Sequence, residues 1–261
     1  MPVNPFDFNG RDVVAFILVL MRVAGLFLTS PIFSSNTIPA QVKAAWTLLV
    51  AFLIFPLVDY SQVDLPALGL PFALAVVREL MVGFTVGMGA YLIFVGIQMA
   101  GQLIDIQMGF GLVNVVDPIT STQVSVMGQY YYMVAMVVFL AVDGHHLLIR
   151  GLIQTFDVIP LGGAHFTPAL MSKMNDLFAQ VFFIAFKVGA PVIGALFITN
   201  LALGIIARTV PQMNVFIVGM PLSVTVGMVV VAMSMSFFVF VLQDMFHGLY
   251  RDMAILIQSM R

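Results

Sequence analysis

The stretch from Gln107 to Pro118 reads Gln-Met-Gly-Phe-Gly-Leu-Val-Asn-Val-Val-Asp-Pro, and the rest of the chain is organised around it. A charge-free run lies on each side of this stretch, residues 80–104 before it and residues 118–142 after it. Each run is long enough to cross a bilayer as a helix. The stretch is therefore predicted to be a loop between two membrane helices. Because its glycines bracket Phe110 and its side chains are mostly apolar, it is unlike an ordinary surface loop in water.

The composition of this loop indicates that protein covers it. Irregular backbone is tolerated at membrane depth only where protein or a water-filled cavity receives its N–H and C=O groups. We therefore expect the loop to fold inward and to block a pore, with Phe110 between two glycine hinges. The residues expected to form this plug are Gln107, Met108, Gly109, Phe110, Gly111, Leu112, Val113, Asn114, Val115 and Val116.

The amino-acid composition is that of an integral membrane protein. Apolar residues make up 61% of the 261 positions and charged residues 8%, against roughly 45–50% and 25% in an average soluble domain. Several runs exceed about 18 residues with few charges, which predicts helices. A transmembrane barrel would instead show alternation of polar and apolar residues in segments of about ten. The fold class predicted is all-α.

About six hydrophobic helical segments are expected within a single membrane domain that spans residues 1–261. Segments three and four, and segments five and six, are joined by turns with polar ends and are expected to form helical hairpins. Pro191 is predicted to kink or break the fifth segment, and Pro221 to split off the first turns of the sixth. Residues 244–261 carry apolar side chains every three to four positions, which is typical of an amphipathic helical tail. The six segments cover approximately residues 12–28, 42–58, 80–104, 123–142, 176–207 and 215–243.

A few charged residues interrupt these apolar segments and are expected to have partners. An arginine near the centre of a membrane helix costs roughly 2.5–3.5 kcal/mol on insertion scales, so Arg22 is expected to face protein or water. The alternative is that its long side chain reaches an interface. Arg78 and Glu79 are adjacent and cannot face each other on a helix, so each needs a partner elsewhere. The charges expected to pair between helices or subunits are Arg22, Arg78, Glu79, Asp105, Lys187 and Arg208.

No catalytic or cofactor motif is found. HExxH, GxSxG, Walker A and a complete GxGxxG are missing from the sequence, and the chain has no cysteine for a thiolate site. Asp143-Gly144-His145-His146 looks like a metal site, but adjacent histidines point in different directions on a helix, so a structural or interfacial role is expected. The net charge of −2, with dispersed Lys and Arg, disfavours nucleic-acid binding. We expect no enzyme activity, no metal and no cofactor.

Several motifs together resemble one family. They are the run from Gly101 to Pro118, the Asp143-Gly144-His145-His146 segment, Thr199-Asn200-Leu201-Ala202-Leu203-Gly204, residues 208–221 and residues 22–33. In combination they resemble the FliR family, a component of the flagellar type III export gate. The resemblance covers almost the whole chain.

This resemblance implies a hetero-oligomeric pore in the bacterial inner membrane, at the base of the flagellar basal body. FliP and FliQ would be the partners in the pore, FlhB would contact it, and contact with FlhA is allowed. Unfolded flagellar proteins would pass outward through the channel. The loop matching residues 107–116 would plug the closed channel, and much of the apolar helix would wind into a conical stack rather than cross a bilayer six times.

Three alternatives remain open from the sequence. A homologous subunit of a virulence type III secretion system is less similar. A solitary secondary transporter with its site near Pro191 is weakened because the interiors of the segments carry Arg22 and Lys187 rather than carboxylates. A purely structural membrane anchor would not need the plug.

Overall fold

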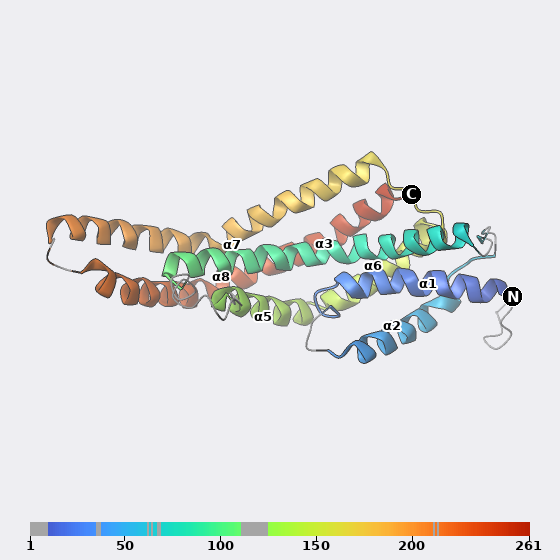
Figure 1. The fold of residues 1–261 in the computed structure, drawn as a ribbon, viewed down its shortest axis with the longest axis horizontal. Helices are drawn as coiled ribbons and strands as arrows, with labels where there is room; N and C mark the ends of the chain where they lie inside the picture. Colours follow the sequence, from blue (N-terminus) through green and yellow to red (C-terminus); the bar gives the residue numbers. More distant parts are fainter. Residues whose placement is uncertain are drawn as a thin grey trace. The chain divides into compact units, whose positions relative to one another are not determined.

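The computed structural model describes residues 10–34, 38–61, 63, 65–66, 69–110, 125–210, 212 and 214–261. Every regular element in these ranges is a helix (Figure 1), which confirms the all-α prediction. Five helices are long and apolar enough to cross a membrane, and a sixth span results if α5 and α6 are counted as one broken span. The elements are α1 (Gly10–Thr29), α2 (Ala40–Ile54), the short 3-10 helix η1 (Phe55–Leu57), α3 (Leu70–Met108), α5 (Val126–Ala141), α6 (Gly144–Val158), α7 (Pro168–Thr209) and α8 (Val215–Ser259).

Several predicted boundaries were wrong. The third segment begins at Leu70 and ends at Met108, so it has 39 residues. Pro191 and Pro221 lie inside α7 and α8, which continue through them, so a break at Pro191 and a split at Pro221 were wrong predictions, whereas a kink at Pro191 stays a prediction. A membrane helix keeps such a proline when neighbouring helices, hydroxyl side chains or local adjustments satisfy the freed backbone groups. The predicted tail is the end of α8 rather than a separate element, and α6 was not predicted as a helix of its own.

The helices group into two compact units. The first comprises residues 1–92, 143–177 and 246–261, and the second residues 93–142 and 178–245. Within the first unit, α1 meets α3 through glycines on both helices. A methyl group on Gly25 would overlap the backbone of Leu80, and one on Gly83 would overlap the backbone of Arg22. Only residues without a Cβ allow this close approach, as in other membrane helix pairs.

The end of α8 forms part of the core of the first unit. Its side chains Leu249, Met253 and Leu256, and Met260 directly after the helix, are at most 1% exposed. Together with Met245, these four are the apolar positions whose spacing of three to four residues predicted an amphipathic helix. A methyl group on Gly151 of α6 would overlap the Cε of Met253, so the two helices are in direct contact.

The second unit contains the end of α3, α5, and most of α7 and α8. A methyl group on Gly101 of α3 would overlap the backbone of Gly128 of α5, so these two helices also meet backbone to backbone. Tyr131 of α5 is 1% exposed and packs edge to face on Phe238 of α8, with ring centroids 4.7 Å apart. Large apolar side chains remain exposed elsewhere on this unit, especially along α7.

Candidate functional site

The end of α3 determines where the predicted plug loop begins. Gly109 has a φ of 90°, a left-handed conformation that suits glycine. Its N–H donates to the carbonyl of Ile106 at 3.2 Å, and the N–H of Phe110 donates to the carbonyl of Asp105 at 3.0 Å. This pair of bonds is the Schellman arrangement that ends many helices. The loop therefore begins at Gly109, two residues later than predicted.

The carboxylate of Asp105 connects the two ends of this loop. It is buried, with 6% exposure. Its Oδ2 accepts the hydroxyl proton of Ser125 at 2.6 Å, and its Oδ1 accepts the N–H of Met127 at 3.1 Å. A negative charge is favourable at a helix N-terminus, and charge-assisted hydrogen bonds of this kind are strong. One carboxylate on the last turns of α3 thus holds the first turn of α5.

Ser125 completes this connection as the N-cap of α5. Its Oγ accepts the N–H of Gly128 at 2.8 Å while its proton goes to Asp105. Serine is a preferred N-cap residue because this bond satisfies a free donor of the first turn. We call the connection of Asp105, Ser125 and Met127 the Asp105 latch. The latch holds residue 110, where the described part of the loop ends, and residue 125, where the described chain resumes, at fixed positions in the second unit.

The structure describes four of the ten predicted plug residues. Gln107 is exposed and Met108 is fully buried, and both belong to the last turn of α3. The side chain of Met108 lies against Gly227 of α8, where its Sδ is 3.1 Å from the position of an added methyl group. Phe110 is half-buried. Gly111, Leu112, Val113, Asn114, Val115 and Val116 lie outside the described residues.

The first unit contains a buried ion pair between α1 and α3. Arg22 and Glu79 are both fully buried, and the guanidinium Nε and Nη2 donate to the Glu79 carboxylate. The Nη1 of Arg22 donates to the hydroxyl of Thr155 at 3.1 Å and to the carbonyl of Ile159 at 3.2 Å. The ring of Phe156 lies 4.2 Å below the guanidinium carbon, a cation–π contact. Arg22 therefore does not reach an interface.

This ion pair connects three segments that are far apart in the sequence. The Oε1 of Glu79 also accepts the N–H of Gly162 at 2.7 Å, so the carboxylate holds the segment after α6. Its neighbour Arg78 is exposed and donates to the carbonyl of the same residue, Gly162, at 3.3 Å. Thr155 and Gly162 were not singled out from the sequence. No spacing in the sequence marks them, because they become partners only through the tertiary fold.

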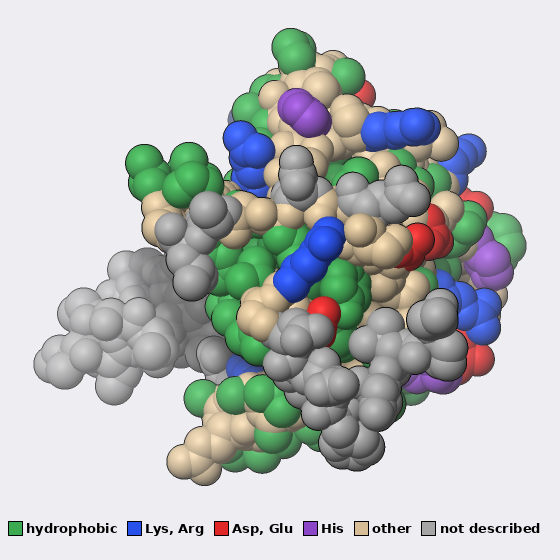
Figure 2. Space-filling view, turned by 90° about the vertical axis from the view of Figure 1, so that its right-hand side faces the viewer, with side chains coloured by type: hydrophobic (Ala, Val, Ile, Leu, Met, Phe, Trp, Pro, Cys, Tyr) green, Lys and Arg blue, Asp and Glu red, His purple; other side chains and the backbone are tan. Residues whose placement is uncertain are grey.

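The remaining predicted charges lie near the surface of the second unit. The Nζ of Lys187 is 3.8 Å from the carboxylate of Asp244, whose side chain is 71% exposed. Arg208 is exposed in the last turn of α7, where a cation is favourable beside the helix dipole. The sequence did not single out the pair of Lys173 and Asp252 in the first unit, 2.8 Å apart. On the face shown in Figure 2, Lys and Arg side chains are scattered among acidic, apolar and other surface and form no single large basic patch.

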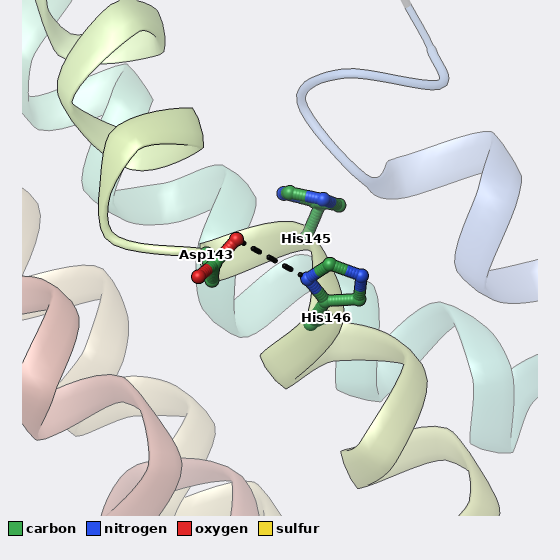
Figure 3. Close-up of side chains that lie close together, drawn as sticks. All are labelled: Asp143, His145 and His146. Carbon is green, nitrogen blue, oxygen red and sulfur yellow. Dashed lines mark hydrogen bonds and ion pairs between the residues drawn. The ribbon is translucent and has the colours of Figure 1, made fainter.

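The histidines at the start of α6 differ from expectation. Rather than pointing apart, the rings of His145 and His146 have centroids 4.1 Å apart. The Nδ1 of His146 is 3.3 Å from the carboxylate of Asp143 (Figure 3). His145 and His146 lie in the first turn of α6, and Asp143, the N-cap residue before it, has a left-handed backbone conformation.

Comparison with known proteins gives a consistent result over almost the whole chain. Residues 13–249 match the family model described as Bacterial export proteins, family 1. The flagellar biosynthetic protein FliR of Bacillus subtilis (strain 168) is 36% identical over 241 residues, which cover 89% of this chain and 90% of that protein. FliR of Escherichia coli (strain K12) is 28% identical over 241 residues, covering 92% of each chain. FliR of Aquifex aeolicus (strain VF5) is 25% identical over 249 residues, covering 95% and 96%.

Proposed function

Because the chain belongs to family 1 of the bacterial export proteins, the family of the flagellar biosynthetic protein FliR, we propose that it is a subunit of a flagellar protein-export channel. The channel lies in the bacterial inner membrane at the base of the basal body and passes unfolded flagellar proteins outward. The loop that begins at Gly109 seals the closed channel. The observation that supports this most is the Asp105 latch, which holds both sides of an apolar loop.

The latch supports a seal for a mechanical reason. A loop with free ends samples many positions, and ordering it costs conformational entropy. The buried carboxylate of Asp105 and the packing of Met108 against Gly227 hold both ends in place before the loop closes anything. The residues between the ends include Leu112, Val113, Val115 and Val116. Their apolar side chains suit contact with other apolar chains around a channel better than contact with water.

The apolar surface of the second unit supports assembly with other membrane proteins. In the part of α7 that belongs to the second unit, seven large apolar side chains are more than half exposed: Phe182, Phe183, Phe186, Phe197, Ile198, Leu201 and Ile205. Surfaces of this kind require lipid or protein as their environment. We propose that FliP and FliQ cover part of this surface in the channel, and that FlhB and FlhA contact the assembled complex. The names of the relatives favour the flagellar system over a virulence secretion system.

The seal is tested by measuring ion conductance. The chain is co-expressed with FliP and FliQ, and the purified complex is inserted into planar bilayers. Deletion of residues 109–111 should open a conductance for small ions, and Phe110→Ala should open a smaller one. Phe166→Ala is the matched control because Phe166 is an exposed aromatic in the first unit. Conductance equal to that of the unaltered complex after the deletion would overturn the proposed seal.

The assignment to flagellar export is tested separately. A strain of the source bacterium that lacks this chain should build no flagellar filaments, and the gene on a plasmid should restore them. The chain should also be recovered in one complex with FliP and FliQ from detergent-solubilised membranes. Normal filaments in the deletion strain would refute the function, whatever the conductance experiment shows.

A further inference from the structure

The N-terminus of α6 carries a carboxylate that does not perform its usual local role. Asp143 is the N-cap residue, and an N-cap aspartate ordinarily accepts a backbone N–H of the first turn through its side chain. Here the side chain makes no such bond. The carbonyl of Asp143 instead accepts the N–H groups of His146 and Leu147, at 3.0 and 3.2 Å. The carboxylate is therefore available to the two histidine rings.

The backbone conformation of Asp143 aims it at those rings. Its φ of 57° and ψ of 30° place it in the left-handed region, and it is the one non-glycine residue with positive φ in the part of the chain that the structure describes. Residues in this conformation store strain, which is often found at binding sites. Aspartate and asparagine are the residues that adopt it most readily. Figure 3 shows the carboxylate of Asp143 and both rings gathered around the first turn of α6.

The three side chains present ligand atoms at a separation that suits a metal ion. One carboxylate oxygen and one nitrogen from each ring all lie within 4.8 Å of one another. The Nδ1 of His145 is buried and has no hydrogen-bond partner within the described residues. A buried polar atom in this state is costly, and such atoms commonly mark a binding function or an ion. Coordination would satisfy it.

We propose that Asp143, His145 and His146 bind a divalent transition-metal ion of the zinc class, with water completing the coordination. Two imidazoles and a carboxylate are ligands that Zn²⁺ takes in proteins. Tetrahedral bonds of 2.0–2.2 Å place two ligand atoms about 3.3 Å apart. The Oδ1 of Asp143 and the Nδ1 of His146 are already 3.3 Å apart, so His145 alone must move closer by rotation of its side chain.

The position of the site sets its strength. The positive end of the helix dipole at the start of α6 opposes a cation, and the charge of Asp143 compensates for it. The side chains of Asp143 and His146 are 74% and 60% exposed, so water competes for the metal. We therefore expect weaker binding than at a closed structural zinc site, and reversible exchange. The bound ion would cross-link the N-cap of α6 to its first turn.

The test is metal titration of the full chain, purified in detergent without a polyhistidine tag and freed of metal by chelation. Zn²⁺ is titrated by calorimetry, and Co²⁺ is used as a spectroscopic probe. We expect one equivalent of Zn²⁺ per chain and a Co²⁺ absorption spectrum characteristic of nitrogen and oxygen ligands. His145→Ala and His146→Ala should each weaken binding at least about tenfold, the loss expected even for groups that only support a metal ligand. Asp143→Asn should weaken it as well, while asparagine retains the left-handed conformation.

Controls separate this site from other sources of binding. His165→Ala is the matched control because His165 is an exposed histidine outside the cluster. This variant should bind Zn²⁺ with the same affinity as the unaltered chain. Helix content and elution volume establish that each variant is folded, and His146→Gln replaces His146→Ala if that variant is not. Absence of saturable Zn²⁺ binding to the unaltered chain would overturn the proposal. Equal affinity in Asp143→Asn, or in a variant lacking both histidines, would overturn it too.

Discussion

Removing the charge of Glu79 tests the role of the buried ion pair in the first unit most directly. Arg22 makes five hydrogen bonds in the structure, two to the Glu79 carboxylate and three to Thr155 and the carbonyl of Ile159. Both charged side chains are fully buried. Glu79→Gln keeps the size of the side chain but leaves the guanidinium without a counter-charge. The substitution therefore isolates the electrostatic part of the interaction.

The expected loss of folding free energy follows from the burial of both charged groups. Breaking a buried ion pair by removing one partner costs about 3–5 kcal/mol, because the remaining charge is desolvated without compensation. Glutamine still offers one acceptor, so we expect the lower end, about 3 kcal/mol. That is a large part of the roughly 5–15 kcal/mol that stabilises a typical domain. Replacing both residues with methionine removes both desolvation costs and should restore much of the loss.

The assay is thermal unfolding of the chain purified in detergent, followed by circular dichroism and by the size-exclusion profile of heated samples. Asp244→Asn is the matched control, since it makes the same chemical change in an exposed pair with Lys187 at 3.8 Å. Exposed pairs of this kind contribute about 1 kcal/mol or less, so little change is expected. The reasoning is refuted if Glu79→Gln unfolds at the same temperature as Asp244→Asn. It is also refuted if the double methionine variant is less stable than Glu79→Gln.

Three further predictions concern the glycine contacts and the ends of the loop. Gly83→Ala should destabilise the first unit by about 1–3 kcal/mol because the added methyl group overlaps the backbone of α1. Gly204→Ala is the control: it has open space around it and should stabilise α7 by about 0.5–1 kcal/mol. Equal shifts of the unfolding temperature in the two variants would refute the close contact. Ser125→Ala should lower the free energy of unfolding by about 1 kcal/mol, because the N-cap hydrogen bond of α5 is lost. Ser125→Thr keeps a hydroxyl group and should keep most of this stability, as measured by thermal unfolding. Gly109→Ala should cost about 1–2 kcal/mol because alanine disfavours a φ of 90°, while Gly109→Asn should cost less, and the reverse order would argue against the left-handed end of α3.

Hydropathy alone was sufficient to predict the membrane class and most helices. The runs on both sides of the loop contain no charged residue over 25 positions each, and apolar runs of this length indicate membrane-spanning helices. The prediction missed α6 because its 15 residues include two histidines, an arginine and an aspartate, which resemble a polar connection. It predicted a kink or a break at Pro191 and a split at Pro221 because proline removes a backbone donor. Hydropathy does not reveal the tertiary contacts that compensate for that loss.

The site could be predicted only in part. The position of Arg22 within an apolar run implies that this arginine needs a partner. The sequence does not indicate that the partner is Glu79, which is 57 residues away. Asp105 and Ser125 are both visible in the sequence as polar residues beside apolar runs. Their hydrogen bond depends on how α3 and α5 pack, with Gly101 against Gly128. The expectation that the rings of His145 and His146 point in different directions was wrong, because their centroids lie 4.1 Å apart, and nothing in the sequence indicated the left-handed backbone of Asp143 beside them.

The sequence by itself determined that the chain is a helical membrane protein of the export family, and where its loop of apolar residues lies. These properties depend on composition and on local order along the chain, so they can be recognised without coordinates. The tertiary structure decided which charges meet, that one carboxylate holds both sides of the loop, and that three side chains at the start of α6 come together. The reason is physical: a hydrogen bond or an ion pair forms between atoms a few ångströms apart, and packing of whole helices sets those distances.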